Sequence, residues 1–187
     1  MAVDPKRYRF TRADYHEMAR TGILKPDVRV ELIDGDIIEM NPIGRPHWTC
    51  VDRLNAFFAP KLPLRAIVRI QNPIPLGDHG EPEPDLALLR YRADFYSGGE
   101  EETPEDILLV VEVADSSELY DRRTKAPLYA EFGIREYWIV DLNNHRIQRY
   151  LDPTPDGYRT TRVYRRGESL SPLAFPDLMI PVDDILG

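Results

Sequence analysis

Apolar residues recur along the chain in short runs that predict the strands of a sheet. The run at 107–111 is continuous and rich in β-branched residues, which predicts a strand buried on both faces. Residues 65–71 alternate instead, with Ala66, Val68 and Ile70 on one face. Further strands are predicted at 85–89, 136–142, 145–151 and 158–164.

Turn residues predict how some of these strands connect. Asp34-Gly35 stands between alternating segments at 28–33 and 36–40, which predicts a tight hairpin. Near the other end, Asn143-Asn144 predicts a turn whose residues tolerate positive φ, and residues 152–157 predict a plain loop.

Two helices are predicted in the first third of the chain. Thr11 followed by Asp14 predicts a capped start, and Gly22 can end that helix. After Gly44, apolar residues at helical spacing predict a second helix as far as Pro60.

A third helix carries polar residues along one face. Ser116-Ser117 are candidate caps, and Asp121, Lys125 and Tyr129 follow at intervals of four residues. Pro127 would kink a helix that begins at the serines, whereas a later start would place it harmlessly in the first turn.

Together these elements predict a single domain, residues 1–187, with a mixed α/β sheet flanked by helices. An N-terminal helix and β-hairpin precede the sheet, and a C-terminal β-hairpin extends it. The proline-punctuated tail at 172–182 is expected to dock on the core in extended form.

Composition favours a globular protein of a reducing compartment. The chain is 42% hydrophobic over 187 residues, which is enough for a sizeable core. One cysteine, Cys50, excludes an internal disulfide and fits the cytoplasm. The start of the chain has no apolar leader, and no apolar run approaches the ~20 residues of a spanning helix, so no membrane partner is expected.

Charge is unevenly distributed along the chain. Ten acids face two arginines between residues 78 and 106, which accounts for the whole net charge of −8. The segment at 91–106 is therefore either a mobile acidic lid or a solvated connection. Six arginines against two acids at 145–166 indicate either a basic docking face or a solvated hairpin.

Two acids and one amine carry the candidate chemistry. Glu112 follows the buried run directly, and a carboxylate there is costly unless a metal ion, lysine or arginine neutralises it. Pro84 has no N–H for a strand ladder, so Asp85 takes the first position of the neighbouring strand. Paired carboxylates with Lys125 nearby suit a hard divalent cation that activates water against a phosphodiester.

Pro84-Asp85, then Glu112-Val113-Ala114, then Lys125, resembles the PD-(D/E)XK nuclease superfamily. The segment at 112–141 is similar to its restriction-endonuclease-like branch, and the resemblance covers about residues 10–182. The superfamily pattern has a lysine where this chain has Ala114. The branch carries that lysine on the following helix, where Lys125 stands.

The resemblance implies a restriction-endonuclease-like fold with Asp85, Glu112 and Lys125 as catalytic residues. Glu31, in Glu-Leu-Ile-Asp-Gly, is either a third carboxylate of the site or a solvent-facing strand acid. The implied ligands of Mg²⁺ or Mn²⁺ are Asp85, Glu112 and the main-chain carbonyl of Val113. Candidate accessory residues are His47, Gln71, Asp121 and Tyr129.

The implied function is a metal-dependent endonuclease that hydrolyses DNA phosphodiester bonds, working as a homodimer because two strands must be reached. One alternative is a binding or scaffold protein of the same fold, in which Glu112 and Lys125 form a structural ion pair. Another is a glycoside hydrolase that uses two carboxylates, although Lys125 and the presence of only two tryptophans count against it.

Overall fold

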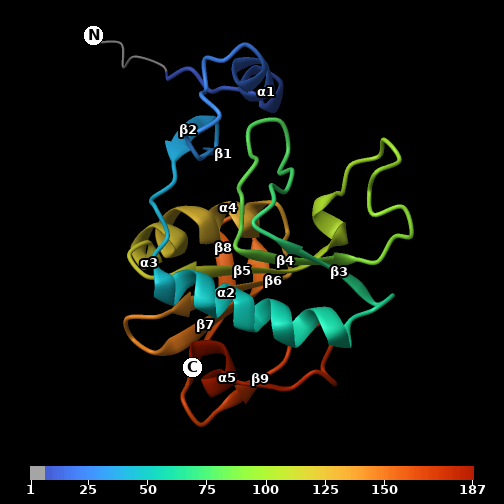
Figure 1. Ribbon diagram of the computed structural model, residues 1–187, viewed down its shortest axis with the longest axis vertical. Helices are drawn as coiled ribbons and strands as arrows, with labels where there is room; N and C mark the ends of the chain where they lie inside the picture. Colours follow the sequence, from blue (N-terminus) through green and yellow to red (C-terminus); the bar gives the residue numbers. More distant parts are fainter. Residues whose placement is uncertain (1–6) are drawn as a thin grey trace.

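A six-stranded mixed sheet forms the centre of the computed structural model, which describes residues 7–187 (Figure 1). Its strands are β3 (Ala66–Ile70), β4 (Leu86–Arg90), β5 (Ile107–Ala114), β6 (Glu136–Asp141), β7 (Arg146–Thr154) and β8 (Gly157–Arg165), in that spatial order. All neighbours are antiparallel except β5 and β6, which are parallel because a helical segment connects them. The predicted mixed α/β sheet is confirmed.

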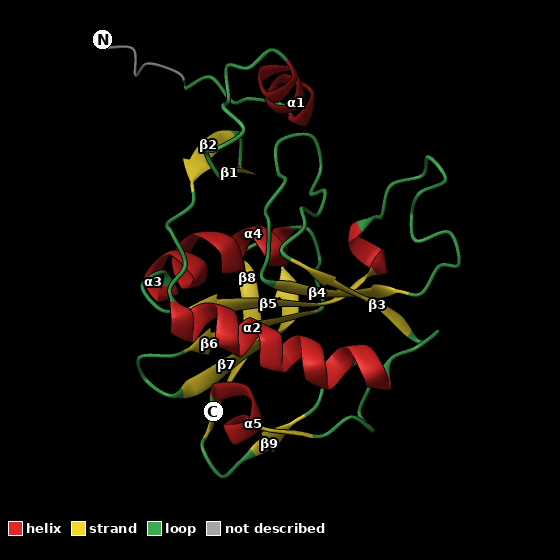
Figure 2. Cartoon of the chain, viewed as in Figure 1, coloured by secondary structure: helices red, strands yellow, loops and turns green. Residues whose placement is uncertain are grey.

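Helices cover both faces of this sheet, so that β5 lies inside the protein (Figure 2). Helix α2 (Arg45–Phe58), followed by η1 (Ala59–Lys61), packs on one face together with the C-terminal segment. Helix α4 (Ala126–Glu131) packs on the other. Val111 and Val113 of β5 face α2, whereas Val110 and Ala114 face α4, which confirms a strand buried on both sides. Glu112, between two residues of the α2 face, therefore points toward α4.

The N-terminal helix and hairpin form a unit beside the sheet. Helix α1 (Arg12–Arg20) has the predicted capping box, with Thr11 and Asp14 bonded reciprocally. Strands β1 (Val30–Ile33) and β2 (Asp36–Glu39) form the predicted hairpin. Leu32 exchanges two backbone hydrogen bonds with Glu81, of 2.7 and 3.3 Å. The hairpin is thereby held against the segment that leads into β4.

The helical segment after β5 is not one regular helix. Helix α3 (Glu118–Tyr120) passes into a π-helical turn, η3 (Asp121–Lys125), in which the N–H of Ala126 donates to the carbonyl of Asp121. Helix α4 begins at Ala126, so Pro127 lies in its first turn. The harmless placement of Pro127 is the one observed, because the proline falls where an unpaired N–H would occur in any case.

The C-terminal hairpin is longer than the sequence pattern indicated. Strand β7 continues to Thr154 and β8 starts at Gly157, so the predicted loop at 152–157 was wrong. Asp152, at φ 58°, takes the irregular position that lets the pairing resume beyond it. In the preceding turn the positive φ falls on His145 rather than on the asparagines.

The tail docks on the core, but not wholly in extended form. It contains β9 (Ser169–Leu170), β10 (Ile180–Pro181) and a closing helix, α5 (Val182–Leu186). Phe175, Ile180 and Val182 are buried as expected, whereas 54% of Leu173 is exposed. The extended prediction failed at α5 because its apolar positions, Val182 and Ile185, are spaced for a helix on the α2 side of the sheet.

The acidic loop at 91–106 ends in η2 (Pro104–Asp106) and lies away from the cavity that holds the candidate site residues. Glu101 pairs with Arg12 at 3.0 Å, and Glu102 pairs with Arg69. No residue of this loop lines that cavity. The loop is thus a connection rather than a lid in this structure.

Half of the arginines at 145–166 are committed to ion pairs. Arg146 bonds Asp141 at 2.8 Å, Arg149 bonds the buried Glu136 at 2.6 Å, and Arg166 bonds Asp183 at 3.0 Å. The exposed arginines that remain are all on β8: Arg159, Arg162 and Arg165. Within residues 7–187, no helix has both the length and the apolar character needed to cross a bilayer.

Candidate functional site

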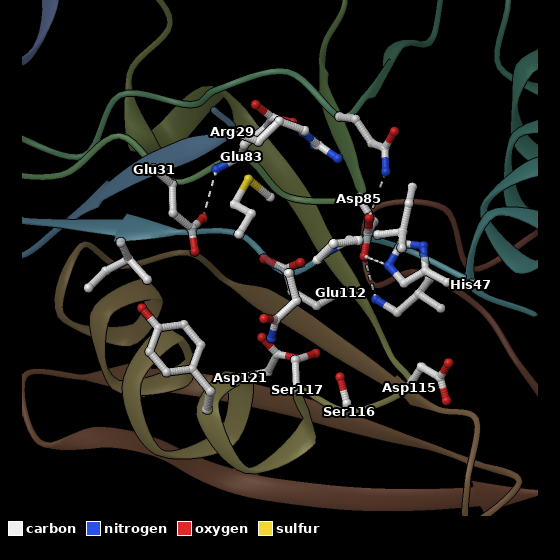
Figure 3. Close-up of a pocket in the computed structure, with 18 of the residues that line it drawn as sticks. Arg29, Glu31, His47, Glu83, Asp85, Glu112, Asp115, Ser116, Ser117 and Asp121 are labelled. Atoms are coloured by element: carbon white, nitrogen blue, oxygen red, sulfur yellow. Dashed lines mark hydrogen bonds and ion pairs between the residues drawn. The ribbon is translucent and has the colours of Figure 1, made fainter. Parts of the chain in front are cut away.

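Four elements far apart in sequence enclose a cavity of about 330 Å³ (Figure 3). The hairpin, the start of α2, the end of β5 with its following turn and the segment just before β4 all contribute to the walls; Asp85 directly precedes β4 rather than opening it as predicted. In the close-up, Glu112 lies between Glu31 and Asp85. Asp121 and Ser117 lie on the side away from Arg29 and Glu83.

Lys125 joins two of the acids. Its Nζ donates to Glu112 Oε1 at 3.0 Å and lies 3.0 Å from Glu31 Oε2. Only 5% of the lysine side chain is exposed, and the two carboxylates are equally buried. The ammonium group of Lys125 in η3 therefore holds Glu31 of β1 and Glu112 of β5 together.

Asp85 accepts two hydrogen bonds and lies against His47. The Val113 N–H donates to Oδ2 at 2.8 Å, and Gln71 Nε2 donates to Oδ1 at 3.1 Å. His47 Nε2 lies 3.0 Å from Oδ2. The first of these contacts forms because the pairing of β4 with β5 begins only at Leu86, opposite Val111, which leaves the Val113 N–H for the aspartate side chain.

Two further side chains on the helical side of the site donate hydrogen bonds to its acids. Tyr129 donates its hydroxyl to Glu112 Oε1 at 3.0 Å, and Ser117 donates to Asp121 Oδ2 at 2.6 Å. Ser117 takes the expected N-cap position of α3, but its side chain makes no cap hydrogen bond to the helix backbone. Its hydroxyl is used by Asp121 instead.

Burial and charge change the ionisation of these groups. Burial raises the pKa of Glu112 well above its usual range, although Lys125 acts in the opposite direction. Burial alone would lower the pKa of Lys125, but Glu112 and Glu31 outweigh it and raise that pKa, so the amine is an ammonium. Burial also raises the pKa of Asp121 to about 6, and it raises that of Tyr129 well above its usual value.

The donor set fits a hard cation in its chemistry. Four buried carboxyl groups line the cavity against one buried amine, so negative charge is in excess. Within residues 7–187, no three Asp, Glu, His or Cys side chains are already grouped as ligands of one ion. Mg²⁺ typically uses one or two carboxylates and completes its shell with water and substrate phosphate, which suits Asp85 and Glu112.

All eight side chains singled out in the sequence lie at or next to this cavity. Glu31 is 3% exposed, so it is not a solvent-facing acid, and His47 is 7% exposed, so it is not a surface residue. Of the eight, only Tyr129 does not line the cavity itself; it reaches the site from behind Glu112. Their catalytic and metal-binding roles remain predictions.

Three other lining residues have no local signal in the sequence. Arg29 and Glu83 form an ion pair at the rim, although 54 residues separate them. The Glu83 N–H also donates to Glu31 Oε2 at 3.2 Å. Tyr120 precedes Asp121, and burial raises its pKa to about 12. No local pattern joins these positions, because tertiary contacts alone bring them together.

Comparison with known proteins assigns the family. Residues 12–183 match the model of the Uma2 family, which is described as "putative restriction endonuclease". The chain belongs to the Uma2 family. The match covers every candidate site residue of the cavity, so the resemblance inferred from Asp85, Glu112 and Lys125 is confirmed at the level of the family.

The fold of this Uma2 chain also has a solved counterpart. A crystal structure of "a putative nuclease belonging to DUF820" from Anabaena variabilis aligns with a TM-score of 0.67 at 17% sequence identity. The alignment covers 95% of this chain and 97% of the other. At that identity the likeness shows the fold alone. A search of curated proteins found no match.

Proposed function

We propose that this Uma2 protein is a metal-dependent endonuclease that hydrolyses phosphodiester bonds of DNA. One observation carries the proposal: the ammonium group of Lys125 contacts both Glu112 and Glu31 in the cavity that Asp85 also lines. The family description, with its reference to restriction endonucleases, supports the reaction class. Nothing in the site or the comparisons supports the glycoside hydrolase alternative.

Asp85, Glu112 and the main-chain carbonyl of Val113 are the groups proposed to hold Mg²⁺ or Mn²⁺. Carboxylate and carbonyl oxygens are the ligands these ions prefer. A bound divalent cation would lower the pKa of an attacking water and polarise the scissile phosphate. The excess of buried acid described above would be partly neutralised by such an ion.

The chain's own groups have separate roles in this proposal. An oxygen of water bonds to phosphorus while the bond from phosphorus to one deoxyribose oxygen breaks. The water loses a proton and the departing oxygen gains one. Lys125 is an ammonium, so it does not accept that proton; it balances the negative charge that develops on the phosphate. His47 and Gln71 keep Asp85 oriented.

The decisive experiment is incubation of supercoiled plasmid with Mn²⁺. The wild-type protein should nick the plasmid, whereas Glu112→Gln and Lys125→Met should lose on the order of 100-fold in rate. Arg122→Met, one turn from Lys125 but exposed, is the matched control and should keep wild-type activity. Equal rates for the wild type and Glu112→Gln would refute the assignment.

A binding or scaffold protein without turnover is the second candidate. Ala114 occupies the position of the lysine in the superfamily pattern, and the contacts of Lys125 also describe a structural ion pair. Calorimetric titration with Mn²⁺ separates the two proposals. Saturable binding that Asp85→Ala abolishes supports the metal site, whereas no binding by the wild type supports the scaffold.

We also propose a homodimer and a cytoplasmic location. A dimer would bring two active sites to the two strands of the DNA. The cytoplasmic proposal rests on Cys50, which is free and buried. Sedimentation analysis tests the dimer, and a single species of monomer mass at micromolar concentration would contradict it.

A further inference from the structure

We propose that the cavity takes an unpaired DNA strand and excludes the interior of a duplex. The inference rests on the proposed function and names the substrate class for that same site. It starts from the depth of the site. The side chains of Lys125, Glu112 and Glu31 are 5%, 6% and 3% exposed, so a phosphate that contacts the amine has to enter the cavity.

A duplex meets this requirement poorly. Its phosphates follow one another at about 3.4 Å of rise along each strand, and the helix is stiff over roughly 150 base pairs. An unpaired nucleotide can instead turn about its backbone into a pocket, as it does in enzymes that act on extruded bases. The cavity of about 330 Å³ is near the lower limit of roughly 300–1,000 Å³ for small-ligand pockets, which suits one nucleotide.

The wall beside the acids suits a base or a sugar. Ile38, Met40, Pro42 and Ile43 line the cavity on the segment that runs from β2 to α2. Apolar and aromatic surfaces hold unpaired bases by stacking and tolerate any sequence. This face would have no partner in a duplex, where the bases are paired and stacked on one another.

Two polar atoms at the cavity also lack a partner. Among residues 7–187, His47 Nδ1 and the hydroxyl of Tyr120 are the buried side-chain atoms without a hydrogen bond. Both residues line the cavity, and His47 is 7% exposed. A buried polar group left unpaired is unfavourable, so the wall around these two residues is not a fully satisfied hydrogen-bond network.

The charge around the opening also favours a single strand over a duplex. Seven carboxyl groups line the cavity against two cations, Arg29 and Lys125, and Glu83 pairs with the arginine. A duplex carries about one negative charge per 1.7 Å of its axis and would be repelled along its length. A single strand has a lower charge density and brings only one or two phosphates to the site.

Trp48 offers a platform for the neighbouring base. It lies in the first turn of α2, one turn after Gly44, which lines the cavity, and 47% of it is exposed. Base stacking on exposed aromatic residues is a common means of holding single strands. We infer that the strand enters across the start of α2.

The test compares three labelled DNAs of one sequence and length in Mn²⁺: a single strand, a fully paired duplex, and a duplex with a central unpaired bubble. The single strand should be cut at least about tenfold faster than the duplex, and cuts in the third DNA should fall in its bubble. Duplex cleavage as fast as single-strand cleavage would overturn the inference and leave the nuclease function intact.

If none of the three DNAs and no plasmid is cut, the proposed nuclease function fails instead. Fluorescence anisotropy in Ca²⁺ then decides the inference by itself. Preference for the single strand of about tenfold upholds it, whereas equal binding, duplex preference or no binding overturns it.

A pair of aromatic variants tests the path of the strand. Trp48→Ala should weaken binding of the single strand about tenfold and leave duplex binding unchanged. Phe95→Ala is the matched control, because Phe95 is 63% exposed in the acidic loop and does not line the cavity. Equal losses for the two variants, or no loss for Trp48→Ala, would contradict a strand that crosses α2.

Discussion

At the scale of single residues, the site depends on one ammonium group that neutralises two buried acids. Lys125 contacts Glu112 and Glu31, and Tyr129 adds a hydrogen bond to Glu112. Ion pairs are strong where water is excluded, but each buried charge also costs desolvation energy. These ion pairs therefore add little net stability to the fold. Removal of one partner would nevertheless destabilise it, because a buried charge would be left unpaired.

Lys125→Met should lower the free energy of unfolding by about 3–5 kcal/mol, because it leaves two buried carboxylates without a cation. Urea unfolding at neutral pH measures this loss. Arg122→Met is the control and should change stability by less than about 0.5 kcal/mol, since Arg122 is half exposed and pairs loosely with Glu118 at 3.4 Å. A loss below about 1 kcal/mol for Lys125→Met would contradict the buried network.

Asp121 predicts a pH dependence of stability. Burial raises its folded-state pKa from 3.8 to about 6, so the folded protein binds this proton more tightly than the unfolded chain does. Its contribution to the free energy of unfolding therefore falls as pH rises from about 4 to 6, by on the order of 3 kcal/mol.

Asp121→Asn should remove that loss and keep an acceptor for the Ser117 hydroxyl. As the pH rises from about 4 to 7, the stability of the variant relative to the wild type should therefore increase by on the order of 3 kcal/mol. Urea unfolding at the two pH values measures the change. A wild-type-to-variant difference that is independent of pH would show that Asp121 is not titrating in the folded protein.

At the scale of elements, a short hairpin and one irregular turn bring the site together. The β1–β2 hairpin carries Glu31 and is fixed by its bonds to Glu81. The π-helical turn η3 directs both Asp121 and Lys125 inward, since both are buried. Such turns occur often at functional sites because they insert a residue without ending the helix.

Gly35 should be the position at which the hairpin is most sensitive to a small change. It has φ 82°, and an added Cβ would lie 2.6 Å from Arg9 Cβ and 2.9 Å from Arg9 Cα. Gly35→Ala therefore adds steric overlap to the ~1–2 kcal/mol of left-handed strain. Stability should fall, and plasmid cleavage should fall with it, because Glu31 shifts with the hairpin.

Gly22→Ala supplies the comparison for that prediction. Gly22 has φ 79°, but nothing lies within 4 Å of an added Cβ. Its loss of stability in urea should be limited to the conformational strain, about 1 kcal/mol smaller than that of Gly35→Ala. Equal losses would mean that the contact between the hairpin and Arg9 does not constrain the turn.

At the scale of the whole molecule, acidic charge restricts where a polyanion can bind. The net charge is −8, and three of the arginines in the C-terminal hairpin neutralise acids of the protein itself. The exposed arginines of β8 form the remaining basic surface of that hairpin. Any attraction of DNA to this surface would be weak and strongly screened by salt.

Arg162→Glu should weaken DNA binding and reduce the slope of log affinity against log salt by about 1. Anisotropy titrations over a series of salt concentrations measure this slope. Arg20→Glu, on the exposed surface of α1, should leave the slope unchanged. If binding by the wild type does not vary with salt, the β8 arginines are not a docking face.

The sequence by itself determined most of the elements and the positions of the candidate site residues. Local signals were sufficient for α1, the hairpin at Asp34-Gly35, the buried strand β5 and the residues Asp85, Glu112 and Lys125. Caps, tight turns and apolar periodicity act over a few residues, so they can be read from one chain. The prediction failed at Asp152 and in α5, where local signals for a loop or an extended tail competed with those for a strand or a helix.

Only the tertiary structure decided which groups face one another. Glu31 became a partner of Lys125 because the hairpin docks on the segment before β4, and Asp85 acquired the Val113 N–H because β4 and β5 part at that point. The Arg29–Glu83 pair and the depth of the cavity arise in the same way. Distance, burial and ionisation belong to side chains that meet across the fold, and no spacing along the chain encodes them.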